Sequence, residues 1–232
     1  MISIIAPCHN EEACLPALVE QIQQAMQARP EPIEILLVDD GSTDKTADVI
    51  RDLETGHAVV RGLFHTRNFG QSASLATGFA AAAGEVFVTL DADLQNPPRE
   101  IPRLLDLLAD DIDAVCGVRV KRQDSPVKRW SSTLANRYRD WVTGVPVRDA
   151  GCNFRVLRRS AVQELLVFNG THRFLATILK LQGCVVLEVE VAHEARLAGE
   201  SKYGIGNRFW RGIQDCGAIR WYRKRCLPVE RT

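Results

Sequence analysis

The chain has 232 residues, of which 46% are hydrophobic and 25% are charged, and its formal net charge is zero. These proportions are typical of a globular protein, and the length fits one large domain or a domain with a small appendage. Seven cysteines are scattered without a CxxC pair, which argues against a disulfide framework or a zinc site and for reduced thiols in a cytoplasm.

The charge is divided unevenly along the chain. Residues 1–118 hold 7 Lys/Arg and 19 Asp/Glu, whereas residues 119–232 hold 22 Lys/Arg and 10 Asp/Glu. The acidic half could hold cations, and the basic half could hold phosphates or an anionic surface, so we expect two different kinds of partner. Chance clustering of solvated charges is the alternative.

The first half alternates short apolar runs with stretches of helical spacing. Strands are predicted at 2–7, 33–40, 58–65, 85–93 and 113–120. Helices are predicted at 11–28, 42–54, 70–83 and 98–110, the second of them opening on a Ser/Thr cap. This alternation predicts βαβ units and a mostly parallel sheet.

The second half is less regular. A polar loop is predicted at 120–129, a mainly helical stretch at 130–166 with an interruption at 143–156, a strand at 184–195 and a basic helical tail from residue 205. We expect no leader peptide, because Met1 runs straight into the apolar run ISIIAP. We also expect no membrane span, because the longest near-apolar stretch, 74–84, is too short.

Three polar clusters follow predicted strands: PCHNEE (7–12), VDDGSTD (38–44) and DADLQ (91–95). Ligands of parallel α/β sheets bind at the carboxyl ends of the strands, where these clusters should converge. Asp91, Asp93 and Gln95 offer the oxygen ligands that Mg²⁺ or Mn²⁺ prefers. The alternative is a polar turn whose aspartates cap the next helix. Dinucleotide and P-loop sites are disfavoured, because no GxGxxG follows the first strand and GxxxxGK[ST] is absent.

Six motifs occur in order: PCHNEE, VDDGSTD, RNFGQSASLATGF, DADLQNPPREIP, DAGCNFRVLRR and RLAGESKYG. Together they resemble glycosyltransferase family 2 enzymes of the GT-A fold. DADLQNPP, RQDS, DAGC and GESKYG resemble most closely the polyprenyl-phosphate branch, which includes dolichol-phosphate mannosyltransferases and bacterial undecaprenyl-phosphate aminoarabinose transferases. The resemblance implies an α/β GT-A domain over residues 1–204, followed by a basic amphipathic, membrane-facing segment over 205–232.

The resemblance also implies an activity: metal-dependent, inverting transfer of a sugar from a nucleotide to a polyprenyl phosphate, with a UDP-sugar favoured and GDP-mannose as the other candidate. Two rivals remain open. One is a family 2 enzyme that acts on a polysaccharide hydroxyl. The other is a non-catalytic subunit that binds a sugar nucleotide and recruits a membrane partner.

Site residues follow from the resemblance position by position. It implies a nucleotide pocket of Pro7, His9, Glu11, Asp39, Asp40, Arg67 and Asp91, although the family often has Tyr in place of His9. It implies that Asp91, Asp93 and Gln95 bind Mg²⁺ or Mn²⁺, and that the catalytic residues are Asp93, Asp149 and Arg119. The acceptor phosphate would bind Arg129, Ser132, Arg196, Ser201 and Lys202.

Structural roles are the alternatives for several of these residues. Glu11 could serve as a helix N-terminal charge, Asp40 as a turn residue before Gly41, and Arg67 as a loop-packing residue. Asp149 matches the position of a catalytic base, or it could orient Arg155 or cap the next segment. A phosphate acceptor hardly requires a base, because its second pKa lies near about 6.

The last 37 residues (196–232) hold 9 Lys/Arg against 3 Asp/Glu, interspersed with aromatic and aliphatic residues. Such a mixture suits an element lying in a membrane interface. We therefore expect peripheral association with the cytoplasmic face of a membrane and leave a membrane-protein partner open. The alternative is a terminal helix that packs an apolar stripe on the domain. No nucleic-acid partner is expected, because no recognised binding motif accompanies the basic residues.

Overall fold

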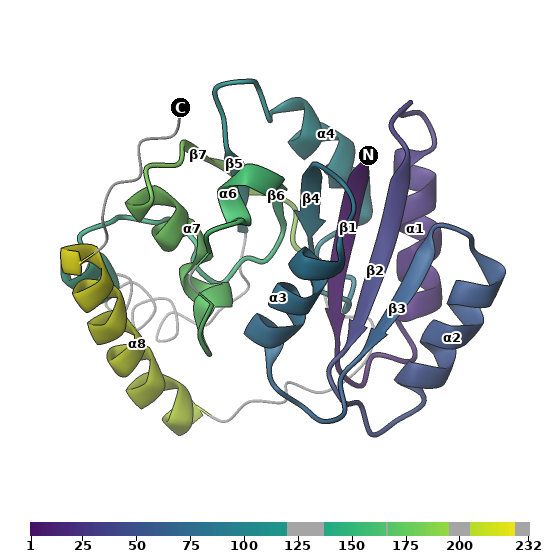
Figure 1. Cartoon of the computed structure of the whole chain (residues 1–232), viewed down its shortest axis with the longest axis horizontal. Coiled ribbons are helices and arrows are strands. Elements are labelled where there is room, and N and C mark those ends of the chain that lie inside the picture. Colours follow the sequence, from purple (N-terminus) through teal and green to yellow (C-terminus); the bar gives the residue numbers. More distant parts are fainter. Residues whose placement is uncertain (120–136, 166, 195–204, 226–232) are drawn as a thin grey trace.

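The computed structural model describes residues 1–119, 137–165, 167–194 and 205–225, with the turns at 205–211 described by their backbone alone. Among these residues a seven-stranded sheet forms the centre of the molecule, in the order β3-β2-β1-β4-β6-β5-β7 (Figure 1). The strands are β1 Ile2–Cys8, β2 Ile33–Asp39, β3 Val60–Phe64, β4 Val86–Thr89, β5 Ala114–Arg119, β6 Arg155–Arg158 and β7 Val186–Val191.

All neighbouring strands are parallel except where β6 lies between β4 and β5, antiparallel to both. The central strand β1 pairs with β2 from Ile2 opposite Ile33, and with β4 from Ile2 opposite Val86. The carboxyl ends of these three strands therefore meet at one edge of the sheet, which confirms the predicted mostly parallel α/β fold and brings the three polar clusters to the same edge.

Helices cover both faces of this sheet (Figure 1). They are α1 Leu15–Met26, α2 Thr46–Gly56, α3 Gln71–Ala81, α4 Ile101–Asp106 after the 3₁₀ turn η1 Pro98–Glu100, α6 Arg159–Val162, α7 Thr171–Leu181 and α8 Ile205–Arg225. Residues 137–143 are also helical. The adjacent residues Ile4 and Ile5 of β1 are both fully buried in different core clusters, because successive side chains of a strand point to opposite faces.

One core cluster joins the sheet to α1 and α4, and the other joins it to α3 and α7. Gly78 lets α3 lie directly on β1, because a side chain at this position would collide with Ile5. The start of α3 is thereby held close to the end of β4, where the predicted metal ligands lie.

Several predicted boundaries are wrong. The strand predicted at 85–93 ends at Thr89, so Asp91 and Asp93 lie in the turn that follows it. The predicted Ser42 cap is absent, because α2 begins only at Thr46 and the Ser42 hydroxyl instead donates to Asp39. The stretch 155–158, predicted as part of an interrupted helical region, is strand β6, and helix α7 was not predicted at all.

The C-terminal helix α8 packs on the rest of the chain. Its Cys216 and Ile219 are buried against Phe174 and Ile178 of α7 and against Val142. The apolar stripe therefore docks on the domain, as the structural alternative anticipated, while a membrane-facing role for the outer face stays a prediction. Within the described ranges, no helix combines the length and apolar character that crossing a membrane requires.

Candidate active site

Asp91 and Asp93 lie in the turn after β4, where Leu94 has a positive φ of 61°. The Oδ1 atom of Asp91 accepts hydrogen bonds from Gln71 Nε2 at 2.8 Å and from Asn153 Nδ2 at 3.0 Å. Asp91 is thus held from two sides, by the first residue of α3 and by the segment before β6. Neither Gln71 nor Asn153 was predicted as a site residue, although both lie in the quoted motifs.

The electrostatics of this turn favour a cation. Burial raises the pKa of Asp91, and the negative charge of Asp93 raises it further. The hydrogen bond from Asn153 and the charges of Arg119 and Arg155 lower this pKa but do not cancel the rise. A divalent cation between the two carboxylates would relieve their repulsion. The donor set of carboxylate and amide oxygens therefore fits Mg²⁺ or Mn²⁺.

The protein ligands for such a cation are few. Asp93 is buried and accepts a hydrogen bond from the backbone N–H of Gln95 at 3.1 Å, while Gln95 Nε2 lies 3.4 Å from the carbonyl oxygen of Glu194. Across the described part of the chain, no group of three or more His, Cys, Asp or Glu could hold a metal. A cation bound here would therefore rely on Gln95 and on oxygens of its substrate to complete its coordination.

The loops after β1 and β2 are joined by hydrogen bonds. His9 Nδ1 lies 3.1 Å from the carbonyl oxygen of Asp40, and the Glu11 N–H donates to Thr46 Oγ1 at 2.8 Å. Pro7, paired with Val38, lies beside them near the end of β1. The structure thus brings together the predicted nucleotide residues of the first two polar clusters. The helix predicted from residue 11 begins only at Leu15, so Glu11 lies in the loop before α1 and contacts Thr46, the first residue of α2.

Asp39 and Asp40 are both buried, and both accept hydrogen bonds from other residues of the chain. Asp39 Oδ1 accepts from the Ser42 N–H at 3.2 Å. Asp40 Oδ1 lies 2.8 Å from His65 Nδ1 and 2.9 Å from the Phe69 N–H. Asp40 Oδ2 accepts from the Gly70 N–H at 2.8 Å. Asp40 therefore fixes the start of α3, and a contact of either aspartate with a nucleotide stays a prediction.

The loop at 67–70 packs tightly against the turn after β2. Gly41 has a φ of +62°, and a side chain there would collide with the backbone of Arg67 and Asn68, so only glycine fits. Arg67 itself is exposed, with its guanidinium 4.6 Å from the ring centre of Phe69. Gly41 and Asp40 together position the loop that leads into α3, whose first residue, Gln71, reaches Asp91.

Arg119, the last residue of β5, forms a bidentate ion pair with Asp149. Its Nε donates to Asp149 Oδ2 at 2.7 Å and its Nη2 donates to Oδ1 at 2.9 Å. Burial alone would raise the pKa of Asp149, but the hydrogen bonds and charge of Arg119 hold that pKa below its ordinary value. Gly151 makes room for the pair, because a side chain at this position would come within 2.7 Å of Arg119 Nη2.

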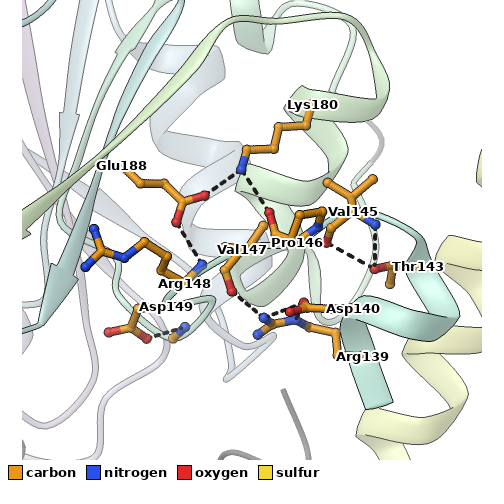
Figure 2. A network of polar contacts seen from close by, with 11 residues as sticks. Arg139, Asp140, Thr143, Val145, Pro146, Val147, Arg148, Asp149, Lys180 and Glu188 are labelled. Carbon is orange, nitrogen blue, oxygen red and sulfur yellow. Dashed lines mark hydrogen bonds and ion pairs between the residues drawn. The ribbon is translucent and has the colours of Figure 1, made fainter. Parts of the chain in front are cut away.

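Three side chains hold the segment 144–149, which has no regular secondary structure (Figure 2): Arg139, Lys180 and Glu188. Arg139 and Lys180 donate to backbone carbonyl oxygens of the segment. Glu188 accepts from the Arg148 N–H at 2.7 Å and also forms an ion pair with Lys180. Asp149 is therefore presented to Arg119 by a network that connects α7, β7 and the helix at 137–143.

Arg155 does not partner Asp149, contrary to one predicted alternative. It is almost fully buried on β6, and its Nη2 donates to the carbonyl oxygen of His172 at 2.8 Å. Its Nη1 has no hydrogen-bond partner among the described residues. The positive charge of Arg155 acts instead on Asp91, whose pKa it helps to lower. The acceptor-phosphate residues predicted at Arg129, Ser132, Arg196, Ser201 and Lys202 lie outside the described residues.

Two solved structures show the same fold. The mycobacterial glucosyl-3-phosphoglycerate synthase from Mycobacterium tuberculosis, solved with Mn²⁺, UDP and phosphoglyceric acid, matches with a TM-score of 0.71 over 99% of this chain and 80% of its own. The mannosyltransferase PcManGT from Pyrobaculum calidifontis, solved with GDP-Man and Mn²⁺, matches with a TM-score of 0.63 over 98% of this chain and 65% of its own. Both are 19% identical to this chain, so they confirm the predicted GT-A fold alone.

Curated relatives are closer in sequence. The undecaprenyl-phosphate 4-deoxy-4-formamido-L-arabinose transferase of Pseudomonas aeruginosa strain LESB58 is 40% identical over 205 residues, which are 88% of this chain and 60% of the relative. The protein of the same name from Aeromonas hydrophila is 39% identical over 207 residues, which are 88% of this chain and 63% of the relative. The chain thus spans 60–63% of the length of these relatives.

The family assignment rests on the part of the chain that carries the site. Residues 3–166 match the family described as Glycosyl transferase family 2. This stretch includes the three polar clusters, Arg119 and Asp149. The chain belongs to glycosyl transferase family 2.

Proposed function

We propose that this protein transfers a sugar from a nucleotide-sugar donor to a polyprenyl phosphate. The observation that carries the proposal is the position of the Arg119–Asp149 pair. The charge of Arg119 reaches Asp91 and lowers the pKa of that carboxyl group, against the effect of burial. A carboxylate pair suited to a cation and a fixed arginine thereby share one edge of a family 2 fold. The names of the curated relatives support a polyprenyl phosphate as the acceptor to test first.

Asp91, Asp93 and Gln95 would hold the cation, Mg²⁺ or Mn²⁺. When bound, such an ion supplies Lewis-acid stabilisation of the negative charge that develops on a departing nucleoside diphosphate. Gln71 and Asn153 keep Asp91 oriented toward this position through their hydrogen bonds. The solved neighbours that contain Mn²⁺ support a divalent ion of this kind.

Arg119 would hold phosphate oxygens, and Asp149 would keep the guanidinium of Arg119 in place. Because the pKa of Asp149 lies below its ordinary value, this carboxylate is a poor acceptor for a proton at neutral pH. A hydroxyl acceptor would require a stronger base. A phosphate acceptor is already largely ionised near pH 7, since its second pKa is about 6. The low basicity of Asp149 thus favours a phosphate acceptor over a polysaccharide hydroxyl.

The donor would bind along the loops after β1 and β2, with Pro7, His9, Glu11, Asp39, Asp40 and Arg67 as candidate contacts. We propose a UDP-sugar, with GDP-mannose as the other candidate, and transfer with inversion, which converts an α-linked donor into a β-linked product. Among sugars, 4-deoxy-4-formamido-L-arabinose is the one to test first, because the names of the curated relatives contain it. Transfer would take place at the cytoplasmic face of a membrane with the protein bound peripherally.

A transfer assay tests this proposal against its rivals. The chain would be incubated with Mn²⁺, a panel of radiolabelled nucleotide sugars, and either a short-chain polyprenyl phosphate in detergent or an oligosaccharide. We expect label on the polyprenyl phosphate, and loss of transfer after chelation of the metal. Transfer to the oligosaccharide alone would contradict the proposed acceptor. Donor binding without transfer to either acceptor would instead support a non-catalytic binding subunit.

A further inference from the structure

A groove lies between the helix at 137–143 and the last turns of α8, with a cavity volume of about 320 Å³. Its lining combines three cationic residues with one aromatic and one aliphatic residue: Arg220, Arg223, Lys224, Trp141 and Val142. Trp141 is 75% exposed, and the three cationic residues are exposed as well. The proposed transfer reaction assigns no role to any of these residues.

No described Asp or Glu side chain compensates the positive charges of the groove. Within the ranges that the structure describes, Arg220, Arg223 and Lys224 form no ion pair with an Asp or Glu side chain. Arg223 Nη1 donates to the carbonyl oxygen of Thr143 at 3.3 Å, which fixes its guanidinium at the end of the helix at 137–143. Three neighbouring cations around an open cavity are suited to a phosphate group, which supplies several acceptor oxygens and a negative charge.

Trp141 lines the groove, and two further aromatic side chains lie on the elements that form it. Tyr138 and Trp141 form a ring pair with centroids 6.3 Å apart, and Trp221 is 62% exposed with the guanidinium of Arg225 6.0 Å from its ring. The strongly exposed Trp and Tyr residues of the described ranges are all on the helix at 137–143 or on α8: Tyr138, Trp141 and Trp221. Trp and Tyr beside Lys and Arg are typical of elements that lie at a membrane–water interface.

The two helices that form the groove pack into the core of the protein. On the inner side of α8, Cys216 and Ile219 are buried against α7, and Val142 belongs to the same cluster. Arg139, from the helix that carries Trp141, donates to the carbonyl oxygen of Val147 two residues before Asp149 (Figure 2). The aromatic and cationic side chains can therefore be exchanged without opening the core, and their position is fixed relative to the segment that presents Asp149.

We infer that this groove binds the phosphate headgroup of an anionic bilayer lipid, with Trp141, Trp221 and Tyr138 at the boundary between lipid and water. The inference deepens the proposed function, on which it rests for the membrane setting. It assigns the lipid contact to two helix ends that meet in space, Tyr138–Val142 and Arg220–Arg225, and it separates this contact from the acceptor site. The residues that line the groove do not include Asp91, Asp93 or Arg119.

Vesicle sedimentation tests the charge of the groove. The chain and the double variant Arg220→Gln/Lys224→Gln are mixed with phosphatidylcholine vesicles, with or without one-third phosphatidylglycerol. We expect the chain to prefer the anionic vesicles and the double variant to partition roughly tenfold more weakly into them. The control Lys45→Gln/Arg51→Gln, at the N-cap and in the middle of α2, removes the same net charge from another surface and should retain binding. Equal losses in the two double variants, or none in either, would overturn the inference.

A second arm tests the aromatic residues. Salt screens the attraction of the cations but not the insertion of an indole ring. At high ionic strength we therefore expect Trp141→Ala to weaken the remaining vesicle binding more than Arg220→Gln/Lys224→Gln does. If Trp141→Ala binds vesicles as the unsubstituted chain does at every salt concentration, Trp141 is not at the lipid boundary.

A third arm separates the headgroup of a bilayer lipid from the acceptor phosphate. Transfer to a short-chain polyprenyl phosphate in detergent should be unchanged in Arg220→Gln/Lys224→Gln if the groove serves the bilayer. A loss of this transfer together with vesicle binding would assign the cations to the acceptor and overturn the inference. If transfer is absent in every variant while vesicle binding still depends on the groove, the proposed function fails and the inference stands. Binding of RNA in place of anionic vesicles would also overturn it.

Discussion

Arg119 and Asp149, thirty residues apart in the chain, face each other with two parallel hydrogen bonds of 2.7 and 2.9 Å. The positive charge of Arg119 also acts on Asp91, where it opposes the rise in pKa that burial and Asp93 cause. Asp149 therefore acts on the site through the arginine that it orients, and its own basicity is reduced by the same contact. Two consequences can be measured.

The first concerns rates. We expect Asp93→Asn to lower transfer by about 100-fold or more, because it removes a ligand of the cation that stabilises the departing diphosphate. Asp149→Asn should lower transfer less, on the order of tenfold, because its remaining oxygen can still accept a hydrogen bond from Arg119. A radiolabelled donor assay measures both, and a larger loss for Asp149→Asn would show that base catalysis matters.

The second concerns acid stability. The pKa of Asp149 lies below its ordinary value of 3.8, so its ion pair contributes stability that is fully present above pH 3.8 and is lost as the pH falls through the lower folded-state value. Urea unfolding of the chain and of Asp149→Asn should therefore differ by a constant free energy at neutral pH, and the difference should shrink only below pH 3.8. A difference that shrinks between pH 5 and pH 7 would contradict the pair.

The two carboxylates after β4 are expected to repel each other when no cation is bound. Burial and Asp93 raise the pKa of Asp91, so the ionised pair costs the folded state free energy at neutral pH. Asp93→Asn should therefore raise the metal-free melting temperature, by roughly 2–4 °C if the cost is about 1 kcal/mol. The same variant should lose the additional rise that Mn²⁺ causes in the unsubstituted chain. An unchanged Mn²⁺ effect would exclude Asp93 as a ligand.

We expect Gln71 to affect metal binding only through its hydrogen bond to Asp91. Its amide donates to Asp91 at 2.8 Å, and loss of such a contact to a metal ligand typically weakens metal affinity about 10–100-fold. Gln71→Ala should weaken Mn²⁺ binding, measured by thermal shift at increasing Mn²⁺ concentrations, while Gln24→Ala on the exposed side of α1 should not. Equal Mn²⁺ affinity in the two variants would contradict the role of Gln71.

We expect Gly151 to be needed for the position of the Arg119 guanidinium. Its missing side chain leaves room for Arg119 Nη2, so Gly151→Ala should push the guanidinium away from Asp149 with little effect on folding. We expect transfer to fall about tenfold, and the melting temperature to fall no more than it does in Asp149→Asn, because both changes disturb the same ion pair. Gly56→Ala is the control, since nothing lies near the position of the added methyl group. Full activity of Gly151→Ala would show that Arg119 tolerates displacement.

The fold class is predictable from the sequence because most strands are apolar runs bounded by glycine, proline or aspartate. Strand β6 is not, because it has four residues, begins and ends with arginine, and gains its stability from pairing with β4 and β5 on either side. The start of α2 could not be predicted either. Ser42 is a residue type that often caps helices, but here its N–H and hydroxyl donate to Asp39. In both cases tertiary contacts override a local preference.

The location of the site is predictable because parallel strands end at one edge of a sheet, which fixes where Asp40 and Asp91 must lie. Which donors hold these carboxylates is not predictable, since Gln71 and Asn153 lie 20 and 62 residues from Asp91 and reach it only through the packing of α3 and β6. Asp149 was expected to act as a base, to orient Arg155 or to cap the next segment. It accepts a hydrogen bond from the Gly151 N–H at 3.0 Å, and only the folded chain identifies Arg119 as its main partner.

A crystal of the chain grown with Mn²⁺ and a nucleoside diphosphate, with data collected at the manganese absorption edge, tests the cation site most directly. We predict an anomalous peak between the carboxylates of Asp91 and Asp93, within bonding distance of Gln95 or of the diphosphate oxygens. A bound nucleotide whose manganese lies elsewhere, with Asp91 still engaged only by Gln71 and Asn153, would contradict it.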